Sequence, residues 1–271
     1  MTPLDEVASE VVREVAAAFL FSPSASLYEE FAEAETDYEV AVVGPENDVE
    51  ADQYVELPLD FRNVTAQIRF GLEGALDQNL VEEEDEIACV TSLFSDGYDA
   101  VIRVQATEFT HSGVYDLFVN SRAEPAVIRN VFEVAIELGK KGQKGKPVGA
   151  LFVVGDAGKV MNKSRPLSYN PFEKSHVHVG DPIVNVMLKE FSRLDGAFVI
   201  SDSGKIVSAY RYLEPSAAGV DIPKGLGARH MAAGAITRDT NAVAIALSES
   251  DGMVRAFKAG ELVLELDPEE Y

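Results

Sequence analysis

Leu194-Asp195-Gly196-Ala197-Phe198-Val199-Ile200-Ser201 begins the part of the chain, Leu194 to Ala233, around which the other segments can be interpreted. The apolar run from Ala197 to Ser201 is typical of a buried strand. Asp195 therefore places a carboxylate at the start of that strand, next to a glycine that permits a sharp turn.

The same part of the chain contains the glycine-rich stretch Gly225-Leu226-Gly227-Ala228-Arg229-His230-Met231, which leads into a predicted helix of small residues, Leu226 to Thr237. Backbone N–H groups at a helix start favour anions, and an arginine fork matches phosphate oxygens. The stretch is no Walker motif, because no Gly-Lys-Ser/Thr follows, and it lacks the third glycine of the dinucleotide fingerprint. An acid suited to a metal ion beside a phosphate cradle outlines a nucleotidyl-transfer site.

Taken singly, these residues have ordinary structural interpretations. An Asp-Gly pair such as Asp195-Gly196 suits a turn, His230 suits a structural hydrogen bond, and Arg229 suits a surface ion pair. Only their combination favours catalysis.

Three elements occur in a fixed order: Asp195-Gly196-Ala197, then Gly227-Ala228-Arg229-His230, then Ser248-Glu249 at the end of a later predicted strand. This order and spacing resemble the diadenylate cyclase (DisA_N, or DAC) domain, whose members carry Asp-Gly-Ala, Gly-Thr-Arg-His-Arg and Ser-Glu elements. The resemblance covers about Glu124 to Leu266. It implies a mixed β-sheet flanked by helices and the condensation of two ATP into cyclic di-AMP with release of two pyrophosphates.

The resemblance also implies roles for individual residues. Asp195, Arg229 and His230 are the expected catalytic residues, and Asp195 and Glu249 are expected to hold a divalent metal, Mn²⁺ or Mg²⁺. The expected ATP-binding residues are Gly196, Ala197, Tyr212, Leu213, Gly227, Ala228, Arg229, His230 and Ser248. Tyr212 and Leu213 would supply an apolar wall for adenine.

The chain departs from the family pattern at three positions. Ala228 replaces the threonine before the arginine, and Met231 replaces the basic residue after the histidine. Bacterial relatives carry Ser-Glu-Glu where this chain has Ser248-Glu249-Ser250, so one carboxylate is missing or shifted to Asp251. Triphosphate contacts are expected to rest on Arg229, His230 and backbone donors.

The net charge of −23 is distributed unevenly along the 271 residues. Up to Arg122 there are 27 acids and 5 bases, whereas the remainder holds 19 acids and 18 bases. The front half would repel nucleic acid and anionic membranes, while the back half can receive a polyanionic substrate. Such acidity also suits concentrated salt, so a halophilic source is expected.

The change in charge balance predicts a boundary between residues 122 and 123. Residues 1–122 are expected to form an acidic α/β domain for scaffolding or assembly, and residues 123–271 the DAC domain. This arrangement resembles the archaeal branch of the family, in which an unrelated N-terminal α/β domain precedes the cyclase.

Hydrophobic periodicity predicts the elements of the acidic domain. The expected helices cover Leu4 to Phe21, much of Ser26 to Glu35 with Ser26 and Glu29 as a capping box, and part of Phe61 to Asn79. The expected strands are Tyr38 to Gly44, Ile87 to Leu93 and Asp99 to Ala106. The alternation favours an α/β layer fold.

In the second domain, the first expected helix begins near Val127 and ends at Gly139. Two further helices are expected over Ile183 to Leu194 and Leu226 to Thr237. The expected strands are Val148 to Val154, Ala197 to Ser201, Gly204 to Leu213, Ala242 to Leu247, Met253 to Phe257 and Glu261 to Leu266. The lysines between Lys140 and Lys146 complement the end of a helix dipole, with phosphate binding as the alternative. His176 and His178 share a face of an extended segment and are interpreted as an exposed strand face, with metal binding as the alternative.

Other sequence features bear on location and assembly. The N-terminus lacks the basic start of a signal peptide and no apolar run is long enough to span a bilayer, so a cytoplasmic protein is expected. Cys89, the single cysteine, lies in an apolar run and is expected in the core. One domain supplies one ATP, so the cyclic product implies a homo-oligomer with two catalytic domains face to face.

Two alternatives use the same residues. A sensor would bind ATP or cyclic di-AMP without turnover, which the changes at Ala228 and Met231 favour and the presence of Asp195 disfavours. An assembly protein would act through its N-terminal domain instead.

Overall fold

The computed structural model describes residues 15–34, 38–59, 61, 63–93, 98–109, 114–142, 145–192, 194–216, 223 and 225–270. The chain divides into two compact units, Met1–Tyr115 and Asp116–Tyr271, with the division inside the short helix α4 (Val114–Val119). Judged by length and hydropathy, no described helix qualifies as a transmembrane span.

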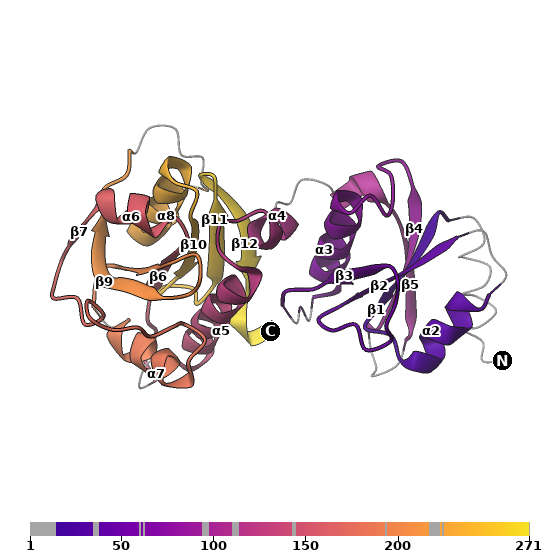
Figure 1. Ribbon diagram of the computed structural model, residues 1–271, viewed down its shortest axis with the longest axis horizontal. Helices are drawn as coiled ribbons and strands as arrows, with labels where there is room; N and C mark the ends of the chain where they lie inside the picture. The colour runs from indigo at the N-terminus through magenta and orange to yellow at the C-terminus, as the bar shows by residue number, and fades with distance from the viewer. Residues whose placement is uncertain are drawn as a thin grey trace. The chain divides into compact units, whose positions relative to one another are not determined.

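The first unit is an α/β layer around a five-stranded sheet (Figure 1). Its elements are β1 (Ala17–Phe21), α2 (Ala25–Ala32), β2 (Glu39–Gly44), β3 (Tyr54–Glu56), α3 (Val64–Asp77), β4 (Glu86–Thr91), β5 (Ala100–Gln105) and the 3-10 helix η1 (Ala106–Phe109). The strand order is β3-β2-β1-β4-β5, in which the first four strands are parallel and the edge strand β5 is antiparallel to β4. Cys89 is a fully buried free thiol in β4, and burial raises its pKa to about 12.

The helix expected over Leu4 to Phe21 is wrong at its C-terminal end. Residues 17–21 form the central strand β1, buried at every position and paired with β2 on one side and β4 on the other. A strand covered on both faces carries a continuous apolar run, which mimics helical spacing over short stretches. The rest of that prediction, residues 4–14, lies outside the described residues.

The remaining expected elements of this unit agree with the structure, except that β3, η1 and the exact helix cap were missed. The α2 helix is capped by Ser24, whose hydroxyl accepts a hydrogen bond from the Leu27 N–H, and not by Ser26. The helix therefore begins two residues earlier than the capping-box pattern indicated.

The second unit contains a seven-stranded mixed sheet with helices on both faces (Figure 1). Its elements are α5 (Pro125–Lys141), β6 (Ala150–Val154), α6 (Ala157–Asn162), β7 (Ser164–Pro166), α7 (Pro182–Phe191), β8 (Ala197–Ile200), β9 (Ile206–Leu213), α8 (Ala228–Asp239), β10 (Val243–Leu247), β11 (Val254–Lys258), β12 (Glu261–Leu266) and the 3-10 helix η2 (Pro268–Glu270). The order is β12-β11-β10-β6-β8-β9-β7. This fold agrees with the expected mixed sheet flanked by helices.

The two faces of this sheet follow from the alternation of side chains along β6. Leu151 and Val153 lie in an apolar cluster with Ala233 and Ile236 of α8 and Val160 of α6. Side chains of neighbouring residues in a strand point to opposite faces, so Phe152 and Val154 face the other side, where α5 packs against β6, β10 and β11. The layers hold the start of α8 close to one edge of the sheet.

Candidate active site

Strand direction brings the predicted residues to one edge of the seven-stranded sheet. The antiparallel pairing of β10 with β6 places Leu247 opposite Ala150, and β6 runs parallel to β8. The end of β10 therefore lies beside the beginnings of β6 and β8. The end of β9 lies at the same edge, because β9 is antiparallel to β8 and Arg211 pairs with Ala197.

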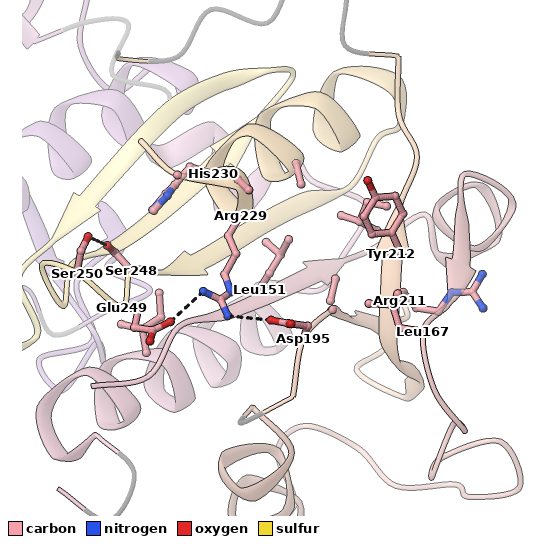
Figure 2. A pocket seen from close by; sticks show the side chains of 17 residues that line it. Leu151, Leu167, Asp195, Arg211, Tyr212, Arg229, His230, Ser248, Glu249 and Ser250 are labelled. Atoms are coloured by element: carbon pink, nitrogen blue, oxygen red, sulfur yellow. Dashed lines mark hydrogen bonds and ion pairs between the residues drawn. The ribbon is translucent and has the colours of Figure 1, made fainter. Parts of the chain in front are cut away.

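A pocket of about 990 Å³ opens at this edge (Figure 2). Every residue that the sequence predicted for the site lines it: Asp195, Gly196, Ala197, Tyr212, Leu213, Gly227, Ala228, Arg229, His230, Ser248 and Glu249. The lining also includes residues that the sequence analysis did not name for it: Leu151, Leu167, Arg211, Ala232, Leu247 and Ser250.

Arg229 lies between the two predicted metal-binding carboxylates. Its Nη1 is 3.3 Å from Glu249 Oε2 and its Nη2 is 3.6 Å from Asp195 Oδ1, as the dashed lines in Figure 2 show. The Asp195 side chain is 93% exposed and that of Glu249 61%, against 34% for Arg229. The carboxylates are thus open to a ligand from the pocket, while the guanidinium is anchored in the protein.

Gly149, immediately before β6, gives the guanidinium its room. A Cβ on this buried glycine would lie 2.5 Å from Arg229 Nη1 and 2.9 Å from Cζ. Such distances are too short for any side chain to coexist with Arg229 in its present place. Nothing in the sequence near Gly149 indicated this role, because the contact depends on how α8 packs beside the start of β6.

Gly196 has a separate structural role at the start of β8. Its φ of +110° belongs to glycine, and a Cβ here would lie 2.7 Å from the backbone of Tyr210. Tyr210 itself has φ +57°, at a place where the β8–β9 register shifts. The Asp-Gly-Ala element therefore needs its glycine because the backbone of β9 approaches so closely at this point, independently of any ligand contact.

His230 lies in the first turn of α8 and is only 4% exposed. Its ring packs on Phe257 with centroids 6.1 Å apart, and neither ring nitrogen has a hydrogen-bond partner. Burial, followed by the nearby Arg255 charge, lowers the pKa of the imidazole. In Figure 2 the ring extends from α8 on the side away from Tyr212. The ring nitrogens of His230 are therefore enclosed by the protein and are not exposed to the pocket in this structure.

Tyr212 forms the opposite wall of the pocket, and its ring is held from behind. The side chain is half exposed, and the Arg165 guanidinium lies 4.6 Å from the ring centroid. Arg165 is the cross-strand neighbour of Tyr212 in the β7–β9 pair, and its Nε donates to Glu214 Oε1 at 2.8 Å. A cation over one face of an aromatic ring favours its orientation and leaves the other face for a flat ligand.

Arg211 lines the pocket but directs its guanidinium toward the protein. It donates hydrogen bonds to Ser164 Oγ and to the carbonyls of Met161 and Ser164, where α6 meets β7. Through these hydrogen bonds, Arg211 at the end of β9 stabilises the position of the short strand β7. This anchoring residue was missed, since α6 and β7 gave no clear periodicity in the sequence.

The pocket holds two carboxylates of the chemical kind that binds divalent ions. Among the described residues, no group of three or more His, Cys, Asp or Glu side chains is arranged to hold a metal ion. These carboxylates belong to Asp195 and Glu249, which contact opposite terminal nitrogens of the Arg229 guanidinium. Hard cations such as Mg²⁺ often use one or two carboxylates, with phosphate oxygens and water completing the shell.

His176 and His178 are both exposed and lie outside the pocket lining. His178 forms an isolated β-bridge with Lys205, and its Nδ1 is 3.2 Å from the Ser203 carbonyl oxygen. Lys140 and Lys141 lie in the last turn of α5, where Lys141 pairs with Glu137 at 2.9 Å. The lysines agree with their interpretation as the end of a helix. The histidines are exposed as expected, but the strand expected there is wrong, because His178 forms only an isolated bridge and His176 lies in no strand.

Two protein families match the two parts of the chain. The family described as "Diadenylate cyclase, N-terminal" matches residues 1–126, and the family described as "DisA bacterial checkpoint controller nucleotide-binding" matches residues 137–262.

Curated relatives extend the match to the whole chain. A diadenylate cyclase of the archaeon Haloferax volcanii is 71% identical over 271 residues, all of both chains. A diadenylate cyclase of Methanocaldococcus jannaschii is 39% identical over 74% of this chain and 66% of that protein.

Solved structures give weaker likenesses. A hypothetical membrane spanning protein from Bacillus cereus has a TM-score of 0.43 and 20% identity, over 57% of this chain and 68% of that chain. A double mutant of DacA from Staphylococcus aureus has a TM-score of 0.39 and 22% identity, over 53% and 88%. With identity to a curated relative along its entire length, the chain belongs to the diadenylate cyclase family, of the type with a distinct N-terminal domain.

Proposed function

We propose that the pocket between β8, β9 and the start of α8 is where this diadenylate cyclase binds ATP and joins two ATP molecules into cyclic di-AMP. The observation that supports this assignment is the position of Arg229 between Asp195 and Glu249. A fork-shaped cation beside two exposed carboxylates provides contacts for phosphate oxygens and for a phosphate-bound cation within one pocket.

The reaction forms two phosphodiester bonds. The 3′-oxygen of each ATP attacks the α-phosphorus of the other, loses its proton, and displaces pyrophosphate as the bond to the bridging oxygen breaks. Asp195 and Glu249 would hold a divalent ion, either Mn²⁺ or Mg²⁺. When bound, this ion supplies charge neutralisation at the α-phosphate and lowers the pKa of the attacking hydroxyl.

The start of α8 is assigned to the triphosphate. Gly227 caps the helix with extended backbone and no side-chain hydrogen bond, so the first-turn N–H groups face no competing capping side chain. Arg229 would neutralise charge on the departing pyrophosphate. His230 lines the same pocket, and because both of its ring nitrogens are buried, the ring would have to turn to donate to a phosphate oxygen.

Adenine is assigned to the apolar wall. Tyr212 offers the face that Arg165 does not cover, and Leu213 and Leu167 line the pocket beside it. Stacking on an aromatic ring is worth about 1–3 kcal/mol per base in nucleic-acid complexes. Gly196, Ala197, Ala228 and Ser248 would contact the nucleotide through backbone atoms or a hydroxyl.

Catalysis by a homo-oligomer completes the proposal. Two catalytic domains face to face would supply the two ATP molecules, and the N-terminal unit would act in assembly. The acidic N-terminal unit disfavours nucleic acid and anionic membranes as partners, and a cytoplasmic location fits an ATP-consuming enzyme.

The deciding experiment is incubation of the purified full-length chain with ATP and Mn²⁺, followed by mass-resolved chromatography. We expect cyclic di-AMP and two pyrophosphates per product, with no product from Asp195→Asn. ATP binding without any cyclic dinucleotide in either Mn²⁺ or Mg²⁺ would refute the enzymatic assignment and favour a sensor. The observation that favours a sensor is Met231, an exposed apolar residue at the position where the family carries a basic one.

A further inference from the structure

The turn that carries Glu249 lies between two hollows of the protein. Ser248, Glu249 and Ser250 line the pocket already described and also a second pocket of about 350 Å³ on the side of Lys140 and Lys146. A turn with space on both sides is not fixed by packing alone. Its position must come from bonds within the turn or to the strand that follows it.

Hydrogen bonds within the Ser248–Gly252 turn close it but do not set its orientation relative to the pocket. The Ser248 N–H donates to the Met253 carbonyl at 3.0 Å, and the Gly252 N–H donates to the Ser248 carbonyl at 3.1 Å. The hydroxyls of Ser248 and Ser250 lie 3.2 Å apart. These contacts are local, so they set the shape of the turn rather than its direction relative to the pocket.

Arg255 connects the turn to the sheet. Its side chain is 8% exposed, and its two terminal nitrogens bind Asp251, with Nη2 2.8 Å from Oδ2 and Nη1 3.2 Å from Oδ1. Its Nε donates to Glu265 Oε2 at 2.5 Å, across the β11–β12 pair in which the two residues are direct neighbours. A bidentate pair with a mostly buried guanidinium restricts orientation far more than an exposed pair does.

Asp251 is fully used by these contacts. Its Oδ1 also accepts the Met253 N–H at 3.1 Å, and the hydrogen bonds from Arg255 hold the pKa of the carboxyl far below its usual range. Asp251 is absent from the lining of the larger pocket. The carboxylate that the sequence analysis considered as shifted to Asp251 is therefore bound to Arg255, and Glu249 is the turn's only carboxylate in that lining.

We infer that Arg255 is a positioning residue of the cyclase, which fixes the Ser248–Gly252 turn through Asp251 so that Glu249 and Ser248 face the nucleotide. The inference rests on the proposed function, since Glu249 is assigned there to the metal ion. Arg255 itself lies outside the pocket lining and is not proposed to touch substrate.

The matched variants are Arg255→Met, Arg255→Lys, Asp251→Asn and Glu265→Gln. Methionine keeps much of the side-chain volume without a charge, and lysine keeps the charge without the fork. Glu265→Gln is the control, because it removes an ion pair of the same arginine on the side away from the turn and retains an acceptor oxygen for Nε.

Two measurements separate positioning from a structural role. Hydrogen exchange of a peptide that spans residues 247–254 should be faster in Arg255→Met and Asp251→Asn than in the wild type and Glu265→Gln. The Mn²⁺ concentration for half-maximal activity should rise at least about tenfold in the same two variants, because mutation of groups that orient metal ligands typically costs about 10–100-fold in metal affinity or activity. Arg255→Lys should lie between.

Unchanged exchange in Arg255→Met, or faster exchange with wild-type Mn²⁺ dependence, would overturn the inference. If exchange in Arg255→Met increases across the whole second unit, that variant has a folding defect and Asp251→Asn decides the question. An unchanged Mn²⁺ dependence in Asp251→Asn would then overturn the inference. If the wild type made no cyclic dinucleotide, the proposed function would be refuted, whereas the exchange comparison would still decide whether Arg255 fixes the turn.

Discussion

Arg229 Nη2 lies 3.6 Å from Asp195 Oδ1, a contact that joins the first turn of α8 to the segment two residues before β8. The acid and the base of this pair are assigned different partners in the ATP complex: a metal ion for Asp195 and phosphate oxygens for Arg229. Their variants should therefore fail in different ways.

Asp195→Asn should abolish turnover while ATP affinity stays within roughly tenfold, about 1.4 kcal/mol. The amide keeps the size of the side chain but is a poor ligand for a hard cation. Product formation and equilibrium ATP binding should be measured on the same preparation. A variant with near-wild-type activity would remove Asp195 from the metal site.

Arg229→Ala should raise the ATP requirement and slow product formation. A charge-assisted bidentate contact is typically worth about 1.5–3 kcal/mol. Arg229→Lys should recover only part of the loss, since lysine lacks the fork. Steady-state kinetics over a range of ATP concentrations tests both, and full activity in Arg229→Ala would mean that backbone donors suffice.

Activity per protomer should fall steeply on dilution below the dissociation constant of the catalytic pair. Each domain is proposed to hold one ATP, so a lone domain cannot close the ring. Specific activity and molecular mass should be followed over the same dilution series. A monomer with undiminished specific activity would exclude the paired mechanism.

Mixing should reveal the same requirement by another route. Equal amounts of wild type and Asp195→Asn, allowed to exchange at random, leave about a quarter of pairs with both aspartates in a two-fold assembly. Activity well below half is therefore expected. Activity of one half, proportional to the wild-type content, would show that each chain works alone.

The melting temperature should climb as KCl increases from about 0.1 M to 1 M, over which the Debye length shortens from about 10 Å to about 3 Å. The physical reason is the surplus of 22 acids over bases up to Arg122, whose mutual repulsion salt screens. A flat or falling melting curve would remove the expectation of a halophilic protein.

The sequence predicted most elements of the second unit and eleven of the residues that line its pocket, because these signals are local. A strand followed by a glycine turn, or a glycine stretch before a helix, can be recognised without knowing the neighbours. The predicted site residues all line one pocket since β6, β8 and β10 end or begin at the same edge. Their chemical roles stay predictions until they are measured.

What the sequence could not give depends on contacts between distant segments. Strand β1 was predicted as part of a helix, because its partners β2 and β4 decide that both of its faces are covered. The support of Tyr212 by Arg165 follows from the β7–β9 register, and the hydrogen bond from Arg255 to Glu265 follows from the β11–β12 register. None of these relations has a local periodic signature.

The hydrogen atom that Gly149 carries in place of a side chain has a consequence for how this enzyme can evolve. The nearest atoms to a Cβ at this position belong to the Arg229 guanidinium, so an added methyl group would displace that guanidinium from its place between Asp195 and Glu249. We therefore expect Gly149→Ala to remove the guanidinium from its present contacts without changing the number of charged groups in the pocket. Natural drift at a position without any functional group is thus restricted by the volume that a neighbouring cation needs.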